Sequence, residues 1–165
     1  METDLRKIKN IARKKEDQNW EFRTFLKGYS TEDLDLIVHS INDRVLSQID
    51  CKNCGNCCRE IYPSFDLQDL QKIAQAMQLS QDQFKDKYLK TDKEPGRFVT
   101  KVKPCPFLKN NICTQYENRP KSCQSYPHLD KSDFVFRLIG VISNYEICPI
   151  VFNVYEALKK EIKYD

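Results

Sequence analysis

The 165-residue sequence has only four glycines, and it contains no glycine-rich phosphate loop and no dinucleotide-binding fingerprint. No apolar stretch follows the charged N-terminus, so we expect neither a secretory signal nor a transmembrane helix, and therefore a cytoplasmic protein without a membrane partner. Repeats, low-complexity tracts and linkers are also missing. A chain of this length forms about one domain and can bury a core without disulfides.

An excess of charge of one sign is lacking as well. The 27 Lys and Arg residues nearly balance the 24 Asp and Glu residues, which leaves a net charge of +3 and a weak long-range field. No basic stripe is interleaved with aromatics. The basic run at residues 13–15 is followed directly by Glu16 and Asp17, which is typical of a solvated helix face. We therefore predict no nucleic-acid partner.

Cysteine, by contrast, is abundant. Four cysteines lie within residues 51–58 and four more follow far downstream, so the chain must fold back to bring them together. The full set is Cys51, Cys54, Cys57, Cys58, Cys105, Cys113, Cys123 and Cys148. In a reducing cytosol such a set indicates metal ligation or redox chemistry rather than disulfides. We expect folding to be coupled to metal capture.

The spacing at residues 51–57, C-x-x-C-x-x-C, is the first part of the bacterial ferredoxin run that holds a cubane iron–sulfur cluster. Cys58 directly after it departs from that run, whereas Cys105 and Cys148 each precede proline, as the remote ferredoxin ligand usually does. Gly55 allows the loop to turn tightly and to bring backbone amides towards sulfur. The match to a ferredoxin site is therefore partial.

Eight thiols match two four-thiolate sites of zinc or iron–sulfur type, or one site with spare cysteines for redox work. The side chains of Cys57 and Cys58 are expected to diverge and to serve different metals, unless one of them bridges. Because the downstream half has no second C-x-x-C pair, a zinc ribbon is disfavoured and an iron–sulfur cluster is favoured over Zn(II). The spacing of radical-SAM enzymes is absent, and the C-x-x-C pair lacks the βαβ surroundings of a thioredoxin-like fold.

Four thiolates around Zn(II) or a cubane core carry a net charge of about −2, which nearby dipoles and cations must offset. Cations that neighbour the cysteines in sequence either do this or are ordinary surface charges; they are Lys52, Arg59, Lys103, Arg119 and Lys121. His39 is expected to be an ordinary helix residue, because eight thiols suffice for common sites. His128 is a reserve ligand.

The first half of the chain reads mainly as helix. Apolar residues recur at helical spacing over residues 5–26, although the polar middle of this segment can break the helix. Ser30 or Thr31 can cap a second helix that delivers the chain to the first cysteine. Asp66 and Ser80 can each cap a further helix.

Short extended segments are expected between and after these helices. Residues 59–65 read as an extended piece, and residues 97–102 alternate like a strand. The pair Asn110-Asn111 favours a tight hairpin turn. In that hairpin Cys105 and Cys113 would stand on the two arms and approach each other.

The remaining chain is again mostly helical. Residues 116–123 predict a single helical turn, residues 134–142 are apolar enough for a strand or a buried helix, and Cys148-Pro149 opens a last helix. The fold class predicted is α+β, mainly helical, with a short β-hairpin and cysteine-rich loops in a single domain. Residues 1–49 would form helices packing on the core, and residues 50–165 the metal-binding region.

Several separate blocks of residues carry a family resemblance: Asp50-Cys51-x-x-Cys54-Gly55-x-Cys57-Cys58-Arg59, Pro104-Cys105-Pro106-Phe107-Leu108, and Cys113-x-x-Tyr116-Glu117-x-Arg119-Pro120-x-x-Cys123-x-x-Tyr126-Pro127. With them the chain resembles the CxxCxxCC (YkgJ-type) cysteine-cluster family, a zinc- or iron-chelating domain, over at least residues 50–149. The resemblance implies a small metal-binding protein whose eight cysteines are the ligand set. The cluster is also similar to that of flagellin lysine N-methylase, which implies methyl transfer to protein lysines as an alternative, although this chain has no segment left for a separate substrate domain.

Two readings compete with redox-linked chemistry at the metal. In one, the metal is structural zinc, and the protein is a binding module whose helix face bears Trp20, Phe22 and Phe25, although such aromatics often belong to a core. In the other, the protein is an enzyme that modifies a protein or a small molecule with acid–base groups near the metal. The candidate acid–base residues are Glu60, Tyr62, Tyr116, Tyr126 and His128.

Overall fold

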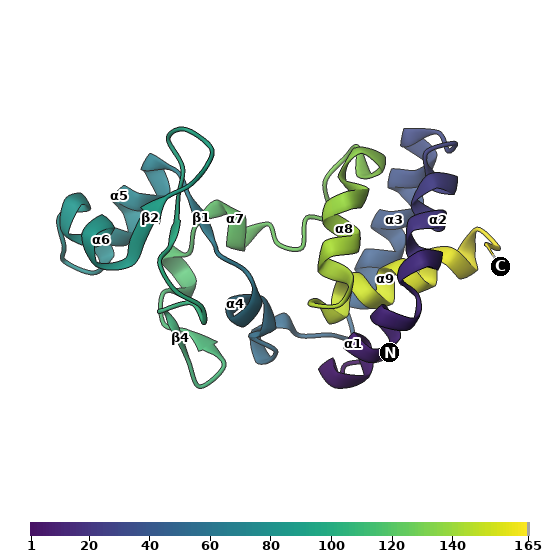
Figure 1. Cartoon of the computed structure of the whole chain (residues 1–165), viewed down its shortest axis with the longest axis horizontal. Coiled ribbons are helices and arrows are strands. Elements are labelled where there is room, and N and C mark those ends of the chain that lie inside the picture. Colours follow the sequence, from purple (N-terminus) through teal and green to yellow (C-terminus); the bar gives the residue numbers. More distant parts are fainter. Residues whose placement is uncertain (165) are drawn as a thin grey trace. The chain divides into compact units, whose positions relative to one another are not determined.

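The computed structural model describes residues 1–164, which fall into two compact units (Figure 1). Met1–Cys51 and the residues from Pro127 onward form the first, called here the helical unit, and Lys52–Tyr126 form the second, the cysteine unit. Helices dominate and the few strands are short and antiparallel, so the predicted class, mainly helical α+β, is confirmed. The predicted grouping of residues 50–165 as a metal-binding region is a functional one and stays a prediction.

The helical unit follows the apolar periodicity of the sequence. Its elements are α1 (Leu5–Lys14), α2 (Glu16–Leu26), α3 (Thr31–Leu46), the 3₁₀ turn η3 (Phe134–Arg137), α8 (Leu138–Tyr145) and α9 (Pro149–Glu161). The expected break in the first helical segment occurs at Lys15, where φ is −104° and ψ is 14°. Ser30 caps α3 by accepting from Asp33 N. The apolar segment over residues 134–142, for which strand and helix were both open, is helical.

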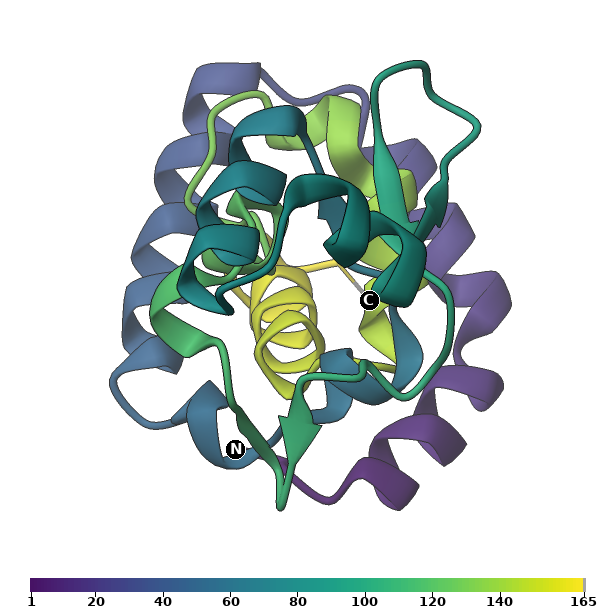
Figure 2. The ribbon, with the colours of Figure 1, turned by 90° about the vertical axis from the view of Figure 1, so that its left-hand side faces the viewer.

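The last helix forms the centre of this unit. Figure 2 looks along α9, which lies between α3 on one side and α1 and α2 on the other, and α8 also packs against it. Pro149 occupies its first turn, as predicted from the Cys148-Pro149 pair. Phe22 of α2 is fully buried against Tyr155, with ring centroids 5.1 Å apart. Neighbouring Trp20 and Phe25 remain 42% and 43% exposed, so only one of the three α2 aromatics belongs to the core.

A buried polar network crosses this core. Lys159 Nζ donates to Asn19 Oδ1 at 2.6 Å and to Glu156 Oε1 at 2.9 Å. Tyr145 Oη donates to the same Glu156 oxygen at 2.7 Å, and Tyr155 Oη donates to Asn19 O at 3.2 Å. Because the Lys159 ammonium and the Glu156 carboxylate are hydrogen-bonded to each other and to these neighbours, the network joins α2, α8 and α9 without leaving either charge unpaired.

The cysteine unit combines short helices with two small sheets. Its elements are α4 (Asn56–Glu60), β1 (Ser64–Phe65), α5 (Leu67–Ala76), α6 (Gln81–Tyr88), β2 (Leu89–Thr91), β3 (Phe98–Thr100), β4 (Leu108–Lys109), β5 (Ile112–Cys113), the 3₁₀ turn η2 (Tyr116–Asn118) and α7 (Lys121–Gln124). Strands β1, β3 and β2 form one antiparallel sheet in that order, and β4 pairs with β5. In Figure 1, α5 and α6 lie side by side next to the first sheet, which they contact.

Local signals placed most of these elements correctly. Asp66 and Ser80 cap α5 and α6, each through a capping box, as predicted. The predicted strand over residues 97–102 is β3, and the Asn110-Asn111 pair forms the hairpin turn, with φ of 50° and 64°. No transmembrane candidate occurs among the described helices, since none is both long and apolar enough to cross a bilayer.

Three local predictions for this unit were wrong in detail. Arg59 and Glu60 are helical rather than extended, because Gly55 starts α4 in the left-handed region and Ile61 N closes it by donating to Cys57 O. The strand β2 was missed because it has only three residues and its first, Leu89, continues the apolar face of α6. The turn over residues 116–123 is two pieces, since the residue before a proline favours extended backbone and Arg119 has ψ of 149°.

The core of the cysteine unit is apolar and includes one of the cysteines. It consists of Phe65, Leu70, Ile73, Ala74, Phe84, Leu89, Cys105 and Phe107. Phe84 and Phe107 stack with centroids 5.9 Å apart. Cys58 and Cys113 pack against this core while remaining partly exposed, so at least three thiols border a dry surface.

Candidate metal centre

The eight cysteines divide between the two units. Six lie in the cysteine unit, namely Cys54, Cys57, Cys58, Cys105, Cys113 and Cys123. Cys51, which is exposed, and Cys148, which is buried before the first residue of α9, belong to the helical unit. All eight carry thiols rather than disulfides.

Four thiols from four separate segments come together within the cysteine unit. Cys58 lies on α4, Cys105 just before β4, Cys113 on β5 and Cys123 on α7. Cys58 is close enough to the other three for its charge to raise the pKa of each, and Cys105 and Cys113 act on Cys123 in the same way. The fold therefore brings together thiols that are up to 65 residues apart in sequence.

The four thiols differ in pKa, and burial raises the pKa of three of them. It raises the pKa of Cys105 to about 11 and that of Cys123 to about 12, and it also raises the pKa of Cys113. Cys58 differs, because a hydrogen bond from the Cys57 thiol, helped by Arg59 and Arg119 and opposed by burial, lowers its pKa to about 7. Without a cation, most of these sulfurs hold their protons at neutral pH; coordination to a metal would remove them.

The Cys57–Cys58 hydrogen bond corrects the expectation that these adjacent side chains diverge. Both residues lie within the short helix α4, and their thiols meet through this side-chain hydrogen bond. Cys58 is further tied to the next cysteine segment, since Cys105 N donates to Cys58 O at 2.7 Å. A main-chain hydrogen bond between these two cysteines thus joins α4 to the segment that leads into the β4–β5 hairpin.

Gly55 brings the cysteine loop directly against the β4–β5 hairpin. Its φ is +61°, and a Cβ atom built there would lie 3.0 Å from Asn111 O and 3.4 Å from Leu108 Cδ1. Only glycine satisfies both the left-handed backbone and the close approach. The neighbouring Arg59 completes the contact, because its guanidinium donates to Cys54 O at 3.2 Å and to Asn111 Oδ1.

The cations predicted to neighbour the cysteines have different roles. Arg59 and Arg119 both lower the pKa of Cys58. At Cys113, where burial raises the pKa, Arg119 partly offsets that rise. Arg119 lies over the Tyr116 ring, 3.8 Å from its centroid. These two guanidinium groups are therefore placed to offset negative charge on the sulfurs.

Of the other candidate cations, Lys52 lies over the same Tyr116 ring as Arg119, 5.1 Å from its centroid. Lys103 donates to Glu60 O at 2.8 Å and sits 4.9 Å from the centroid of the Tyr62 ring. His39 and His128 belong to the helical unit, where His39 Nε2 lies 3.3 Å from Lys131 O and burial lowers the pKa of His128.

The donor set fits a thiophilic metal by its chemistry. Soft thiolates select zinc and iron–sulfur clusters, and the dry surface beside Cys105 excludes competing water. Across residues 1–164, however, no three Cys, His, Asp or Glu side chains already stand in ligand geometry.

Comparison with known proteins gives one match. No curated protein and no solved structure matches the chain, and the similarity to flagellin lysine N-methylase is not confirmed. A family model, CxxCxxCC, described as "Putative zinc- or iron-chelating domain", matches residues 50–139, which is more than half of the chain. Seven of the eight cysteines lie inside the match, and Cys148 lies outside it. The chain belongs to the CxxCxxCC family of zinc- or iron-chelating domains.

Proposed function

We propose that this protein holds an iron–sulfur cluster, with Zn(II) as the alternative, and that its role is redox-linked. The observation that carries the proposal is that Cys58, Cys105, Cys113 and Cys123 come from four segments of one unit and that the charge of Cys58 raises the pKa of the other three thiols. Four thiols in such proximity are the number that one cubane cluster or one structural zinc ion needs.

The charges of the cysteine unit support an anionic centre. Residues 52–126 contain 13 Lys and Arg against 8 Asp and Glu, although the whole chain is nearly balanced. Four thiolates around a cubane core carry about −2, and Arg59 and Arg119 lie where they reduce the cost of that charge. When bound, an iron–sulfur cluster would supply a one-electron carrier. Its reduction potential would respond to these two cations and to the apolar core beneath the thiols.

We assign all eight cysteines as ligands. Cys54 and Cys57 lie close to Cys58 in sequence, and Cys51 precedes Cys54 with the C-x-x-C spacing of the ferredoxin run. Cys148 precedes proline, as a remote ferredoxin ligand does. Eight thiols would serve two four-thiolate sites, or one site with spare cysteines for redox work. Because thiols need a reducing compartment to stay available to metal, we place the protein in the cytoplasm.

Metal and sulfide analysis of protein purified without oxygen tests this function. We expect a brown protein with iron and acid-labile sulfide, and single Cys→Ser variants at positions 58, 105, 113 and 123 should each lose most of the metal. Ile112→Ser is a matched control, since it adds a serine at an exposed site beside Cys113 without removing a thiol. A colourless protein with stoichiometric zinc would overturn the iron assignment, and a metal-free folded protein would overturn metal binding itself.

The zinc outcome would favour the second function, a binding module with a structural metal. The observation in its favour is the exposure of Trp20 and Phe25 on α2, because large exposed aromatics are enriched where proteins bind partners. Replacing both with serine would then abolish partner binding while leaving the zinc content unchanged.

A further inference from the structure

The helix that carries Cys123 lacks a cap of its own. α7 has only four residues, and the residue before it is Pro120, whose side chain offers no hydrogen-bond acceptor. The N–H groups of its first turn therefore need an acceptor from elsewhere in the chain. Without one, a helix this short would have little to fix its place.

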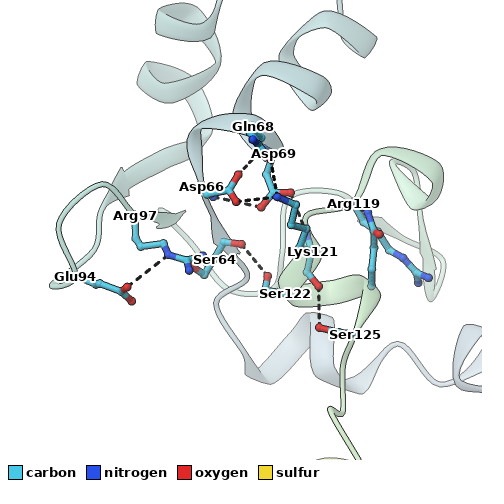
Figure 3. Close-up of polar contacts among 11 residues, drawn as sticks. Ser64, Asp66, Gln68, Asp69, Glu94, Arg97, Arg119, Lys121, Ser122 and Ser125 are labelled. Atoms are coloured by element: carbon cyan, nitrogen blue, oxygen red, sulfur yellow. Dashed lines mark hydrogen bonds and ion pairs between the residues drawn. The ribbon is translucent and has the colours of Figure 1, made fainter. Parts of the chain in front are cut away.

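Asp69, which lies 52 residues upstream, supplies that acceptor. Its carboxylate is only 6% exposed, and Oδ1 accepts from Lys121 N at 3.0 Å (Figure 3). The second oxygen, Oδ2, accepts from Asp66 N at 3.2 Å and completes the capping box of α5. One buried carboxylate thus helps to cap the N-termini of both α5 and α7, and of these two helices only α7 carries a thiol.

Further contacts hold the same segment in place. Ser122 Oγ donates to Ser64 O of β1 at 2.7 Å, as Figure 3 shows. Lys121 Nζ donates to Gln68 Oε1 at 2.7 Å, and Lys72 Nζ donates to Glu117 O in η2 at 2.8 Å. The segment before Cys123 is therefore anchored to α5 and β1, and among these anchors Asp69 is the buried one that receives a main-chain donor.

We propose that Asp69 is a positioning residue of the metal centre, because it caps α7 from α5 and thereby fixes the place of the Cys123 thiol relative to Cys58 and Cys105. This inference rests on the proposed function, which makes Cys123 a ligand. Ligands must be held to within about 0.5 Å of productive geometry, and partners behind the ligands typically change metal affinity about 10- to 100-fold when removed.

The test uses the metal-loaded protein and measures how fast it loses metal to a strong chelator, with the absorption spectrum and reduction potential as further readouts. We expect Asp69→Ala to lose metal about 10- to 100-fold faster than wild type and Ser122→Ala to be faster by a smaller factor. Asp69→Asn keeps an oxygen that can accept from Lys121 N, so it should retain a rate close to that of wild type.

Gln83→Ala is the matched control. Gln83 has the same capping-box position on α6, where its Oε1 accepts from Ser80 N at 2.9 Å, and α6 carries no thiol. Its loss should weaken a helix cap and leave the rate of metal loss, the spectrum and the potential unchanged.

The outcomes separate the inference from the function on which it rests. If Asp69→Ala and Gln83→Ala lose metal at the same rate while Cys123→Ser loses its metal, the positioning role is refuted and the ligand assignment stands. If Cys123→Ser keeps full metal content, the ligand assignment is refuted, and the inference with it. Should Asp69→Ala fail to fold, a wild-type rate of metal loss in Ser122→Ala together with unchanged spectra would refute the positioning of α7.

Discussion

Replacing Gly55 with alanine should damage the metal centre more than the loss of one glycine elsewhere. Gly55 combines a positive φ of +61° with a Cβ position 3.0 Å from the carbonyl oxygen of Asn111. That oxygen belongs to the backbone of the β4–β5 turn, so it cannot rotate away as the end of a side chain could. The hairpin carrying Cys113 would have to move, or the loop would have to open.

The structure contains glycines that separate these two effects. Gly96 has φ of +77° with nothing near its Cβ position, so Gly96→Ala should cost only the left-handed backbone, about 1–2 kcal/mol. Gly55→Ala adds a steric contact worth about 1–2 kcal/mol more, for a total of about 2–4 kcal/mol. Gly140→Ala, in open space within α8, should stabilise the helical unit by about 0.5–1 kcal/mol.

Urea unfolding of the protein as purified, followed by circular dichroism, gives the free energies, and the rate of metal loss to a chelator reports on the metal centre. Gly55→Ala should accelerate metal loss, whereas Gly96→Ala and Gly140→Ala should not. Equal destabilisation by Gly55→Ala and Gly96→Ala, or equal rates of metal loss, would show that the loop does not depend on its contact with the hairpin.

The helical unit offers further tests. Lys159→Met should lower the free energy of unfolding by about 3 kcal/mol, because Glu156 would stay buried with one cation fewer; equal stability in urea would contradict this. Burial alone would raise the pKa of Glu156, but its hydrogen-bond donors outweigh burial and hold the pKa below 4.5. The stabilisation is therefore present above pH 4.5 and lost as the pH falls through the depressed value, so the stability gap between wild type and Glu156→Gln should shrink in acid, and a constant gap would refute it. Asp35→Ala removes the acceptor for Asp133 N and Phe134 N, at 2.7 and 2.9 Å, and should cost about 1–2 kcal/mol in the same assay.

Helix starts were the part of the fold that could be read from the sequence. Ser30, Asp66 and Ser80 cap helices where predicted, since a cap acts on backbone groups within three residues of itself. The polar stretch that was expected to interrupt the first helical segment does so at Lys15. Short strands were harder, and β2 was missed because three residues give too little alternation to be told from the end of α6.

The partners of the candidate site were only partly visible in advance. Arg59 and Arg119 were candidates among five cations, and the structure distinguishes them by their effect on Cys58. Asn111 was predicted only as part of a hairpin turn, and Asp69 was not singled out at all. Asp69 carries a weak signal, because it lies three residues after a helix cap, but its bond to Lys121 N depends on a contact across 52 residues.

The sequence by itself determined the number and spacing of the cysteines, the family and the mainly helical class, because composition, spacing and caps act locally. Only the tertiary structure decided which thiols meet. It brings Cys58, Cys105, Cys113 and Cys123 near one another within one unit and assigns Cys51 and Cys148 to the other unit. The physical reason is that proximity, burial and the resulting pKa values depend on contacts between residues far apart in the chain, which no local pattern encodes.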